Sequence, residues 1–208
     1  MGTRKKAALE QFNRDNILDA AKELFELKGV EATTMDDIAR HADYSKSTIY
    51  VYFKSKEDIY NSIVEDYLSI LTGEIETCIS ADEGFEETYF RLCDCLVSFE
   101  EKYPKYYASL MGEENMTNSR KKTNIINQDV GRELRELISN LLEKGVRHNI
   151  LRKDIDLQPT VLYVWSAISG IIQVADRKKD TLKNKVNMDK EEYLKYSFIT
   201  FYDSLVRR

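Results

Sequence analysis

Residues 33–60 read TTMDDIARHADYSKSTIYVYFKSKEDIY, and this stretch predicts two short helices in succession. Thr34 and Ser45 are residue types that cap helix N-termini, because their hydroxyl oxygens accept hydrogen bonds from free backbone N–H groups. The first helix is expected to end near His41, which leaves Ala42-Asp43-Tyr44 as the connection to the helix that Ser45 begins. Such a pair predicts a helix-turn-helix, in which the second helix can enter the major groove of DNA.

Apolar residues at helical spacing flank this stretch on both sides. Upstream, residues 13–28 predict a helix that ends at Gly29, a residue suited to the position after a helix. Downstream, residues 56–79 predict one long helix. The apolar side chains of the short helices can pack against the upstream helix, so that three helices share one small core: Leu24, Phe25, Ile38, Ala39, Ile49 and Phe53.

This packing leaves a polar outer surface on the second short helix: Lys46, Ser47, Thr48, Tyr50 and Tyr52. Hydroxyls and amines of this kind bind phosphates or base edges. A basic face can form beside them from Arg4, Lys5, Lys6, Arg14, Lys46, Lys54 and Lys56. Residues 1–54 hold 9 basic and 9 acidic residues, so we expect only a modest attraction to DNA. The pattern alone also fits a connector helix or a tyrosine-rich core.

The same stretch resembles the signature of the TetR family of transcriptional regulators. The residues that agree at fixed spacing are Thr34, Ile38, Ala39, Ser45, Ser47, Thr48, Ile49, Tyr50, Tyr52, Phe53, Ser55, Lys56 and Glu57. The resemblance covers roughly residues 13–65. Beyond these residues it is only architectural, because the chain has long helices in the right number. It implies an Ω-like homodimer of about nine helices, with an N-terminal domain for operator DNA and a C-terminal domain for a small molecule and dimerisation.

The resemblance also implies roles for individual residues. Base or groove contacts would come from Lys46, Ser47 and Tyr50, and phosphate contacts from Thr34, Thr48, Tyr52 and Lys56. Ser45 is also expected to be a DNA-binding residue. Two positions depart from the family pattern, since Asp43 and Ser47 each replace a frequent glycine. Asp tolerates left-handed backbone conformations, so the turn can survive, but its charge is unfavourable near phosphate. Arg4, Lys5 and Lys6 can form an arm that binds DNA or a disordered tail.

Composition agrees with an all-α fold in two domains. The 208 residues include 42% hydrophobic residues, 8 Gly and 2 Pro, which is enough apolar matter for a core and too few turn residues for a strand-rich fold. We expect a helix-turn-helix domain over 1–55 and an effector-binding and dimerisation domain over 56–208. Three cysteines and an N-terminus without an apolar signal segment favour the cytoplasm. The net charge of −5 argues against a protein covered with nucleic acid, although it permits one local basic face. With only two histidines and no metal, cofactor or catalytic motif, we predict neither an enzyme nor a metal or cofactor site.

The C-terminal part does not reveal its ligand. Candidate ligand contacts are aromatic or polarizable residues, each of which can equally be plain core: Tyr67, Tyr89, Cys93, Leu96, Tyr106, Tyr107, Met111 and Trp165. Residues 157–175 carry no charge, and their six polar or proline interruptions favour a core or interface helix over a membrane span. Gly170 would permit close helix packing, and residues 177–187 are expected to form a charged loop.

These observations predict a ligand-responsive DNA-binding regulator. The main hypothesis is a homodimeric repressor that a small molecule releases from a palindromic operator, with no membrane partner. The alternative is a regulator of the same fold with no small-molecule effector, which is constitutive or controlled by a protein partner.

Overall fold

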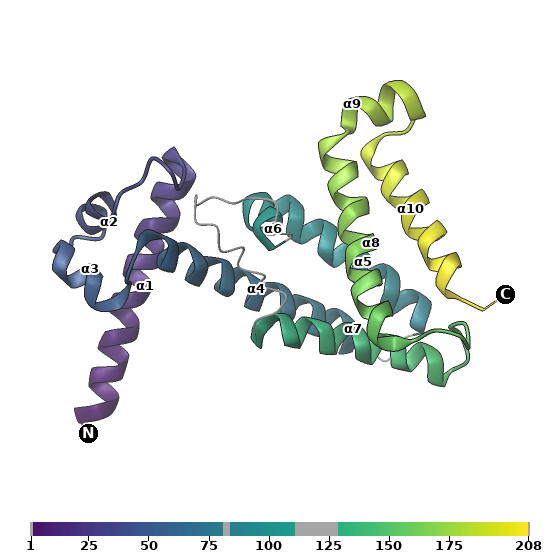
Figure 1. The fold of residues 1–208 in the computed structure, drawn as a ribbon, viewed down its shortest axis with the longest axis horizontal. Coiled ribbons are helices and arrows are strands. Elements are labelled where there is room, and N and C mark those ends of the chain that lie inside the picture. The colour runs from purple at the N-terminus through teal and green to yellow at the C-terminus, as the bar shows by residue number, and fades with distance from the viewer. Residues whose placement is uncertain (1, 81–83, 111–128, 208) are drawn as a thin grey trace. The chain divides into compact units, whose positions relative to one another are not determined.

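The computed structural model describes residues 2–80, 84–110 and 129–207, and these residues are helical almost throughout (Figure 1). The helices are α1 (Gly2–Lys28), α2 (Met35–His41), α3 (Lys46–Tyr52), α4 (Lys56–Ser80), α5 (Phe85–Lys102), α6 (Pro104–Leu110), α7 (Asp129–Arg147), α8 (Leu157–Arg177), α9 (Lys179–Thr181) and α10 (Lys190–Leu205), with a π-helical segment η2 (Leu182–Val186) between the last two. The predicted all-α fold is therefore confirmed. In the described ranges the β-type pairing is a single bridge between Leu151 and Val206.

Backbone contacts divide the described residues into two compact units, one ending at Tyr67 and the other beginning at Leu68. The division falls within α4, which continues without a break from Lys56 to Ser80. The functional boundary that we expect at residues 55 and 56 stays a prediction.

The first unit is built around the core that the sequence predicts. Its fully buried side chains come from α1, α2, α3, the residue after α3 and the first turns of α4: Ile17, Ala21, Ile38, Ile49, Phe53, Ile59 and Ile63. Phe25 meets Tyr60 edge to face, with ring centroids 6.0 Å apart. Gly29 follows α1 with φ +82°, the left-handed conformation expected of a residue in this position.

Helix α1 is longer than predicted, because it begins at Gly2 instead of residue 13. Residues 4–12 are exposed, so no apolar face of this segment is buried and periodicity does not reveal it. Ala, Leu, Lys, Glu and Gln favour helix through intrinsic propensity instead. The alternative of a disordered tail at Arg4, Lys5 and Lys6 is therefore wrong.

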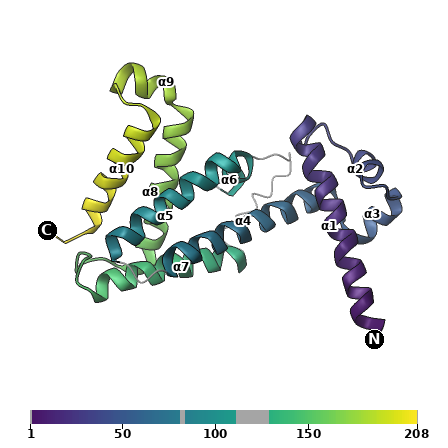
Figure 2. The ribbon, with the colours of Figure 1, turned by 180° about the vertical axis from the view of Figure 1, so that it is seen from behind.

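In the second unit, α8 packs against α7 and α10, and α5 contacts α7, α8 and α10. Helices α8 and α10 lie side by side in both views (Figures 1 and 2). An aromatic cluster joins α5 to α10, in which Tyr89 lies 5.2 Å from Tyr202 between ring centroids. The Tyr89 hydroxyl donates a hydrogen bond of 3.0 Å to the carbonyl of Phe198. This unit therefore has its own core, separate from that of the helix-turn-helix.

Helix α8 is the one helix of the described residues whose length and hydropathy would allow it to cross a membrane. That finding is weak evidence, since core helices of soluble proteins have the same composition. Its apolar side chains are divided between the core, where Val164, Trp165 and Ile168 are buried, and the surface, where Leu162 and Tyr163 are exposed.

The expected charged loop over residues 177–187 is wrong, since α9 and η2 occupy most of it. Leu182 is buried to 3% exposure and anchors these turns to the second unit. Asn187, with φ +57°, ends them in the left-handed conformation that Asn tolerates. One leucine among lysines and polar residues is too weak a periodic signal to predict a helix.

Candidate nucleic-acid interface and ligand core

The start of α2 is fixed by a capping box. The Thr34 hydroxyl accepts a hydrogen bond of 3.1 Å from the backbone N–H of Asp37, and the Asp37 carboxylate accepts one of 3.0 Å from the backbone N–H of Thr34. Lys28 donates to the same carboxylate at 2.7 Å. The hydrogen bonds from Lys28 and Thr34 lower the pKa of Asp37 far below its usual value. Thr34 remains exposed at the N-terminus of α2.

The turn before α3 contains the predicted left-handed residue. Asp43 has φ +58°, the conformation for which glycine is the usual solution. The next residue, Tyr44, donates from its hydroxyl to the Asn13 side-chain oxygen at 2.8 Å. The Asn13 amide donates in turn to the Tyr52 hydroxyl at 2.9 Å. One residue of α1 therefore contacts both the turn before α3 and the last residue of α3, a role that apolar periodicity could not predict because Asn13 is polar and half-buried.

Helix α3 begins with three hydroxyls close together. The Ser45 hydroxyl oxygen caps the helix by accepting from the backbone N–H of Thr48 at 3.1 Å. It also lies 2.8 Å from the Ser47 hydroxyl and 2.7 Å from that of Thr48. Ser45 and Ser47 are exposed and Thr48 is half-buried. Hydroxyls donate and accept, so this turn can adapt to phosphate oxygens or base edges.

The other outward residues of α3 are Lys46 and Tyr50. Lys46 reaches back to Asp36 of α2 at 2.9 Å, and this hydrogen bond raises the pKa of the ammonium. Tyr50 is 49% exposed and so available for contact. The side-chain exposures of Lys46 and Asp36 are 52% and 57%, which means that water screens the pair and a phosphate can compete for the lysine.

Several cations predicted to face DNA have partners inside the first unit. Lys56 donates to the carbonyls of Val30 at 2.6 Å and Glu31 at 3.2 Å, which joins the start of α4 to the end of α1. Arg14 lies over the Phe53 ring, 4.3 Å from its centroid, and donates to Ser62 at 2.9 Å. The contacts of Lys56 and Tyr52 with phosphate stay predictions, and they now compete with these internal hydrogen bonds.

The predicted ligand contacts are distributed unevenly. Six are buried in the second unit: Tyr89, Cys93, Leu96, Tyr106, Tyr107 and Trp165. Tyr67 is half-buried and is the last residue of the first unit, and Met111 lies outside the described residues. Burial raises the pKa of the Cys93 thiol to about 12, so this group is a protonated core thiol.

Two hydroxyls in this buried region have no hydrogen-bond partner among the described residues: those of Tyr107 on α6 and Ser169 on α8. Leaving a buried polar group unsatisfied costs about 1–3 kcal/mol, so native proteins rarely retain such a group without a reason. Burial raises the pKa of Tyr107. The Ser169 hydroxyl lies close enough to Tyr107 to offset part of this rise in its pKa, although the two hydroxyls do not meet the geometry of a hydrogen bond. The aromatic ring of Tyr107 marks it in the sequence as a candidate ligand contact, whereas Ser169 carries no such signal.

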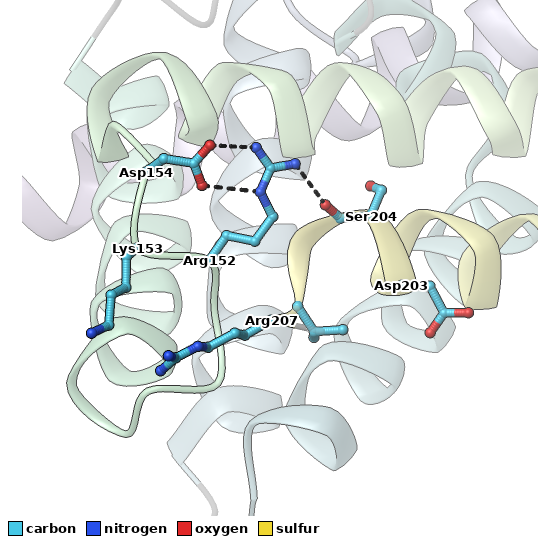
Figure 3. A pocket seen from close by; sticks show the side chains of 7 residues that line it. Arg152, Lys153, Asp154, Asp203, Ser204 and Arg207 are labelled. Atoms are coloured by element: carbon cyan, nitrogen blue, oxygen red, sulfur yellow. Dashed lines mark hydrogen bonds and ion pairs between the residues drawn. The ribbon is translucent and has the colours of Figure 1, made fainter.

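Surface pockets of the second unit lie away from these residues. One, of about 500 Å³, is formed where the segment after α7 meets the end of α10 (Figure 3). Arg152 makes two hydrogen bonds to Asp154 there, at 3.1 and 2.7 Å, which neutralise its charge. Another, of about 370 Å³, lies between α7 and α8 and is lined by Arg132, Arg135, Glu136, Ser139, Gln158, Val161 and Leu162. Neither is lined by a predicted ligand contact.

Comparison with known proteins agrees with this geometry. Residues 17–63 match the family described as bacterial regulatory proteins, tetR family. The chain is 32% identical over 128 residues to the biofilm operon icaADBC HTH-type negative transcriptional regulator IcaR of Staphylococcus aureus, covering 58% of this chain and 67% of IcaR. It is 28% identical over 152 residues to the HTH-type transcriptional repressor KstR2 of Rhodococcus jostii, covering 70% and 71%.

A solved structure shares the fold over almost the whole chain. It is a transcriptional regulator of the TetR/AcrR family from Thermobifida fusca, with a TM-score of 0.69 and 22% identity. The superposition covers 94% of this chain and 98% of the other. The fold of the second unit is therefore shared as well, although the family match itself lies in the first unit.

Proposed function

Because the chain belongs to the TetR family of transcriptional regulators, we propose that it is a repressor that binds a palindromic operator as a homodimer and leaves it when a small molecule binds. The observation that carries the DNA-binding part is the first turn of α3, where Ser45, Ser47 and Thr48 gather their hydroxyls at an outward helix start. We assign base or groove contacts to Lys46, Ser47 and Tyr50, and phosphate contacts to Thr34, Thr48, Tyr52 and Lys56.

Repression is supported by the relatives. IcaR is described as a negative regulator and KstR2 as a repressor, and the matches to them extend beyond the helix-turn-helix. The chain carries three free thiols, Cys78, Cys93 and Cys95, which suits the cytoplasm, where an operator is found. We assign it no catalytic activity.

The homodimer is supported by apolar side chains left exposed on α8 and α10. Tyr163 and Val174 of α8 are 56% and 39% exposed, and Tyr196 and Ile199 of α10 are 59% and 41% exposed. Gly170 lies between the two residues of α8, and among the described residues a Cβ there would meet nothing within 4 Å. No described neighbour in the chain requires glycine at this position, so we assign its close packing to the partner subunit. Trp165 is buried inside its own chain and belongs to the core.

The response to a small molecule would use α4. This helix starts at the helix-turn-helix and ends among the residues of the second unit, so a ligand bound there can alter the spacing of two recognition helices in a dimer. Those helices must lie about 34–36 Å apart to enter successive major grooves. Ligand and DNA would then weaken each other's binding by the same factor.

Titration of labelled upstream DNA at two salt concentrations tests the proposal. We expect one inverted repeat to bind more tightly than scrambled DNA and to lose affinity steeply as salt rises. A ligand that raises the melting temperature should also release the DNA. Failure to bind any duplex at low salt would overturn DNA binding. Unchanged DNA affinity with every stabilising ligand would favour the regulator without an effector.

A further inference from the structure

The unpartnered hydroxyls of Tyr107 and Ser169 lie in the interior of the second unit. Tyr107 is 2% exposed and Ser169 is 3% exposed, and they belong to different helices, α6 and α8. Other buried hydroxyls of this unit have protein partners: Tyr89 donates to Phe198, Thr88 to Gly84, and Ser109 to Lys105. Among the described residues, the buried side-chain groups without a hydrogen-bond partner are those of Tyr107 and Ser169.

The surroundings of the pair are largely apolar. The Phe99 ring of α5 lies 6.5 Å from that of Tyr107, between centroids. Cys93 of α5, fully buried, is close enough to influence Tyr107 electrostatically. Trp165 lies one helical turn before Ser169 on α8 and is also buried. The hydroxyls of Tyr107 and Ser169 are therefore surrounded largely by aromatic rings and a protonated thiol.

We propose that Tyr107 and Ser169 together bind an uncharged oxygen, a carbonyl or a hydroxyl, of an otherwise apolar small molecule. Each hydroxyl can donate one hydrogen bond and accept another, so the pair can satisfy a carbonyl with two donors or an alcohol with a donor and an acceptor. The aromatic neighbours would receive the hydrocarbon part. This inference rests on the proposed effector response, because it names the chemical class of the effector.

The nearby charges disfavour an anionic ligand. The Glu100 carboxylate of α5 is 6% exposed and acts on Tyr107 as a negative charge. Its ion-pair partner Lys190, 3.4 Å away, is shared with Glu101 at 3.0 Å and Asp176 at 3.9 Å. Three carboxylates therefore share this ammonium, which leaves it poorly placed to compensate a ligand carboxylate. A ketone or alcohol adds no charge to this cluster.

The sole tryptophan of the chain provides the measurement, because Trp165 lies beside Ser169. Full-length protein is titrated with two neutral probes, 2-undecanone and cyclododecanone, and with the matched carboxylates undecanoate and cyclododecanecarboxylate, while Trp165 emission and melting temperature are followed. We expect a neutral probe to change the emission and raise the melting temperature, with an affinity at least tenfold above that of its carboxylate. No response to either neutral probe, or equal affinity for the carboxylates, would overturn the proposal.

Two variants test the pair itself. Tyr107→Phe and Ser169→Ala each remove one unpartnered hydroxyl, so they should weaken neutral-probe binding about tenfold and leave the ligand-free melting temperature equal or higher. The matched controls are Tyr202→Phe and Ser109→Ala, whose hydroxyls contact Glu86 and the carbonyl of Lys105. They should keep the preference for neutral probes. A hydroxyl pair satisfied only by a buried water would instead give Tyr107→Phe and Ser169→Ala a lower ligand-free melting temperature and unchanged probe binding, which would contradict the inference.

Operator binding by the same proteins separates the two proposals. All four variants are expected to bind DNA like the parent protein in the absence of probe. If the parent protein binds a neutral probe through Tyr107 and Ser169 but its DNA affinity does not change, the proposed ligand site is supported and the proposed release of DNA by a ligand is wrong. If DNA is released by a ligand that Tyr107→Phe binds equally well, the effector response stands and this site is wrong.

Discussion

At the scale of single residues, the surface proposed to contact DNA depends on which of its polar groups already have hydrogen-bond partners within the chain. Lys46 is paired with Asp36, and Lys56 donates to two carbonyls, so under the proposed function DNA would have to compete for these ammonium groups. The Tyr52 hydroxyl accepts a hydrogen bond from Asn13, and its own proton could still be donated to a phosphate. The residue types could be predicted from the sequence, but their partners could not, because Asp36 and Asn13 reach them only through the three-dimensional packing.

Replacing Asp36 by Asn should strengthen DNA binding. The change removes a negative charge beside α3 and frees Lys46, so one further phosphate contact becomes available. We expect affinity to rise about threefold to tenfold and the slope of log affinity against log salt to steepen by about 0.9. Asp154→Asn, which also breaks an exposed ion pair but lies in the second unit, is the control of equal charge. A similar gain from both variants would point to net charge alone.

Asp37 predicts a specific acid sensitivity. Its pKa is lowered in the folded protein, first by the Lys28 hydrogen bond and then by Thr34. The stabilisation is therefore complete above the unfolded value of about 4 and is lost as pH falls through the lower folded value. Urea unfolding followed from pH 6 to pH 2 should show a smaller acid loss for Asp37→Asn than for the parent protein. Thr34→Ala should cost about 1 kcal/mol at pH 7 through the lost cap. An unchanged acid loss in Asp37→Asn would refute this role.

At the scale of helices, the sequence predicted those helix boundaries and turns that depend on capping residues and on periodic burial of apolar side chains. Thr34 and Ser45 cap the helices that they were expected to cap, and Asp43 adopts the left-handed turn. The errors occur where few or no side chains are buried: the first turns of α1, which are exposed, and α9 with η2, where Leu182 is buried among exposed residues. Helical spacing alone also does not decide burial: Ile70 of α4 and Val146 of α7 are apolar, yet they are 42% and 39% exposed.

The exposed start of α1 should add to the DNA footprint. Asn13 contacts the turn before α3 and the last residue of α3. Arg4, Lys5 and Lys6 lie seven to nine residues before Asn13 on the same helix, about 10–14 Å away. Their side chains are exposed, and Lys6 has only a loose 3.9 Å pair with Glu10. Replacing all three by Ala should reduce the salt slope by about 2.7 if each contacts one phosphate.

The control for that variant removes three exposed lysines of the second unit, Lys178, Lys183 and Lys185. It has the same change in net charge and should leave the slope nearly unchanged. Equal slopes for the parent protein and the Arg4, Lys5, Lys6 variant would show that this end of α1 does not contact DNA.

At the scale of the whole molecule, the described residues form two compact units within one chain. In the first unit, α3 packs against a core formed by residues of that unit. The second unit has its own aromatic core, with two buried hydroxyls that have no hydrogen-bond partner among the described residues. The second unit also leaves large apolar side chains on α8 and α10 uncovered. The sequence predicted an apolar helix over the residues of α8, but which residues of α8 and α10 are exposed depends on how the two helices pack together.

Charge placed on this exposed surface should separate the subunits without unfolding either one. Tyr196 and Ile199 are 59% and 41% exposed, so Tyr196→Asp with Ile199→Asp removes little buried area from the chain itself. In a dimer the same carboxylates would be buried unpaired, which is strongly unfavourable. Sedimentation should then show a monomer with an unchanged circular dichroism spectrum. Operator affinity should fall at least 100-fold, because each recognition helix would bind one half-site alone.

The matched control places two aspartates on other exposed apolar residues, Leu27 and Val186, which are 82% and 49% exposed. It should remain dimeric and bind the operator within about threefold of the parent protein, which allows for two added negative charges. A Tyr196, Ile199 variant that stays dimeric would move the interface away from α10. A monomer that kept full operator affinity would contradict operator binding by a homodimer, because the spacing of two recognition helices would then contribute nothing to recognition.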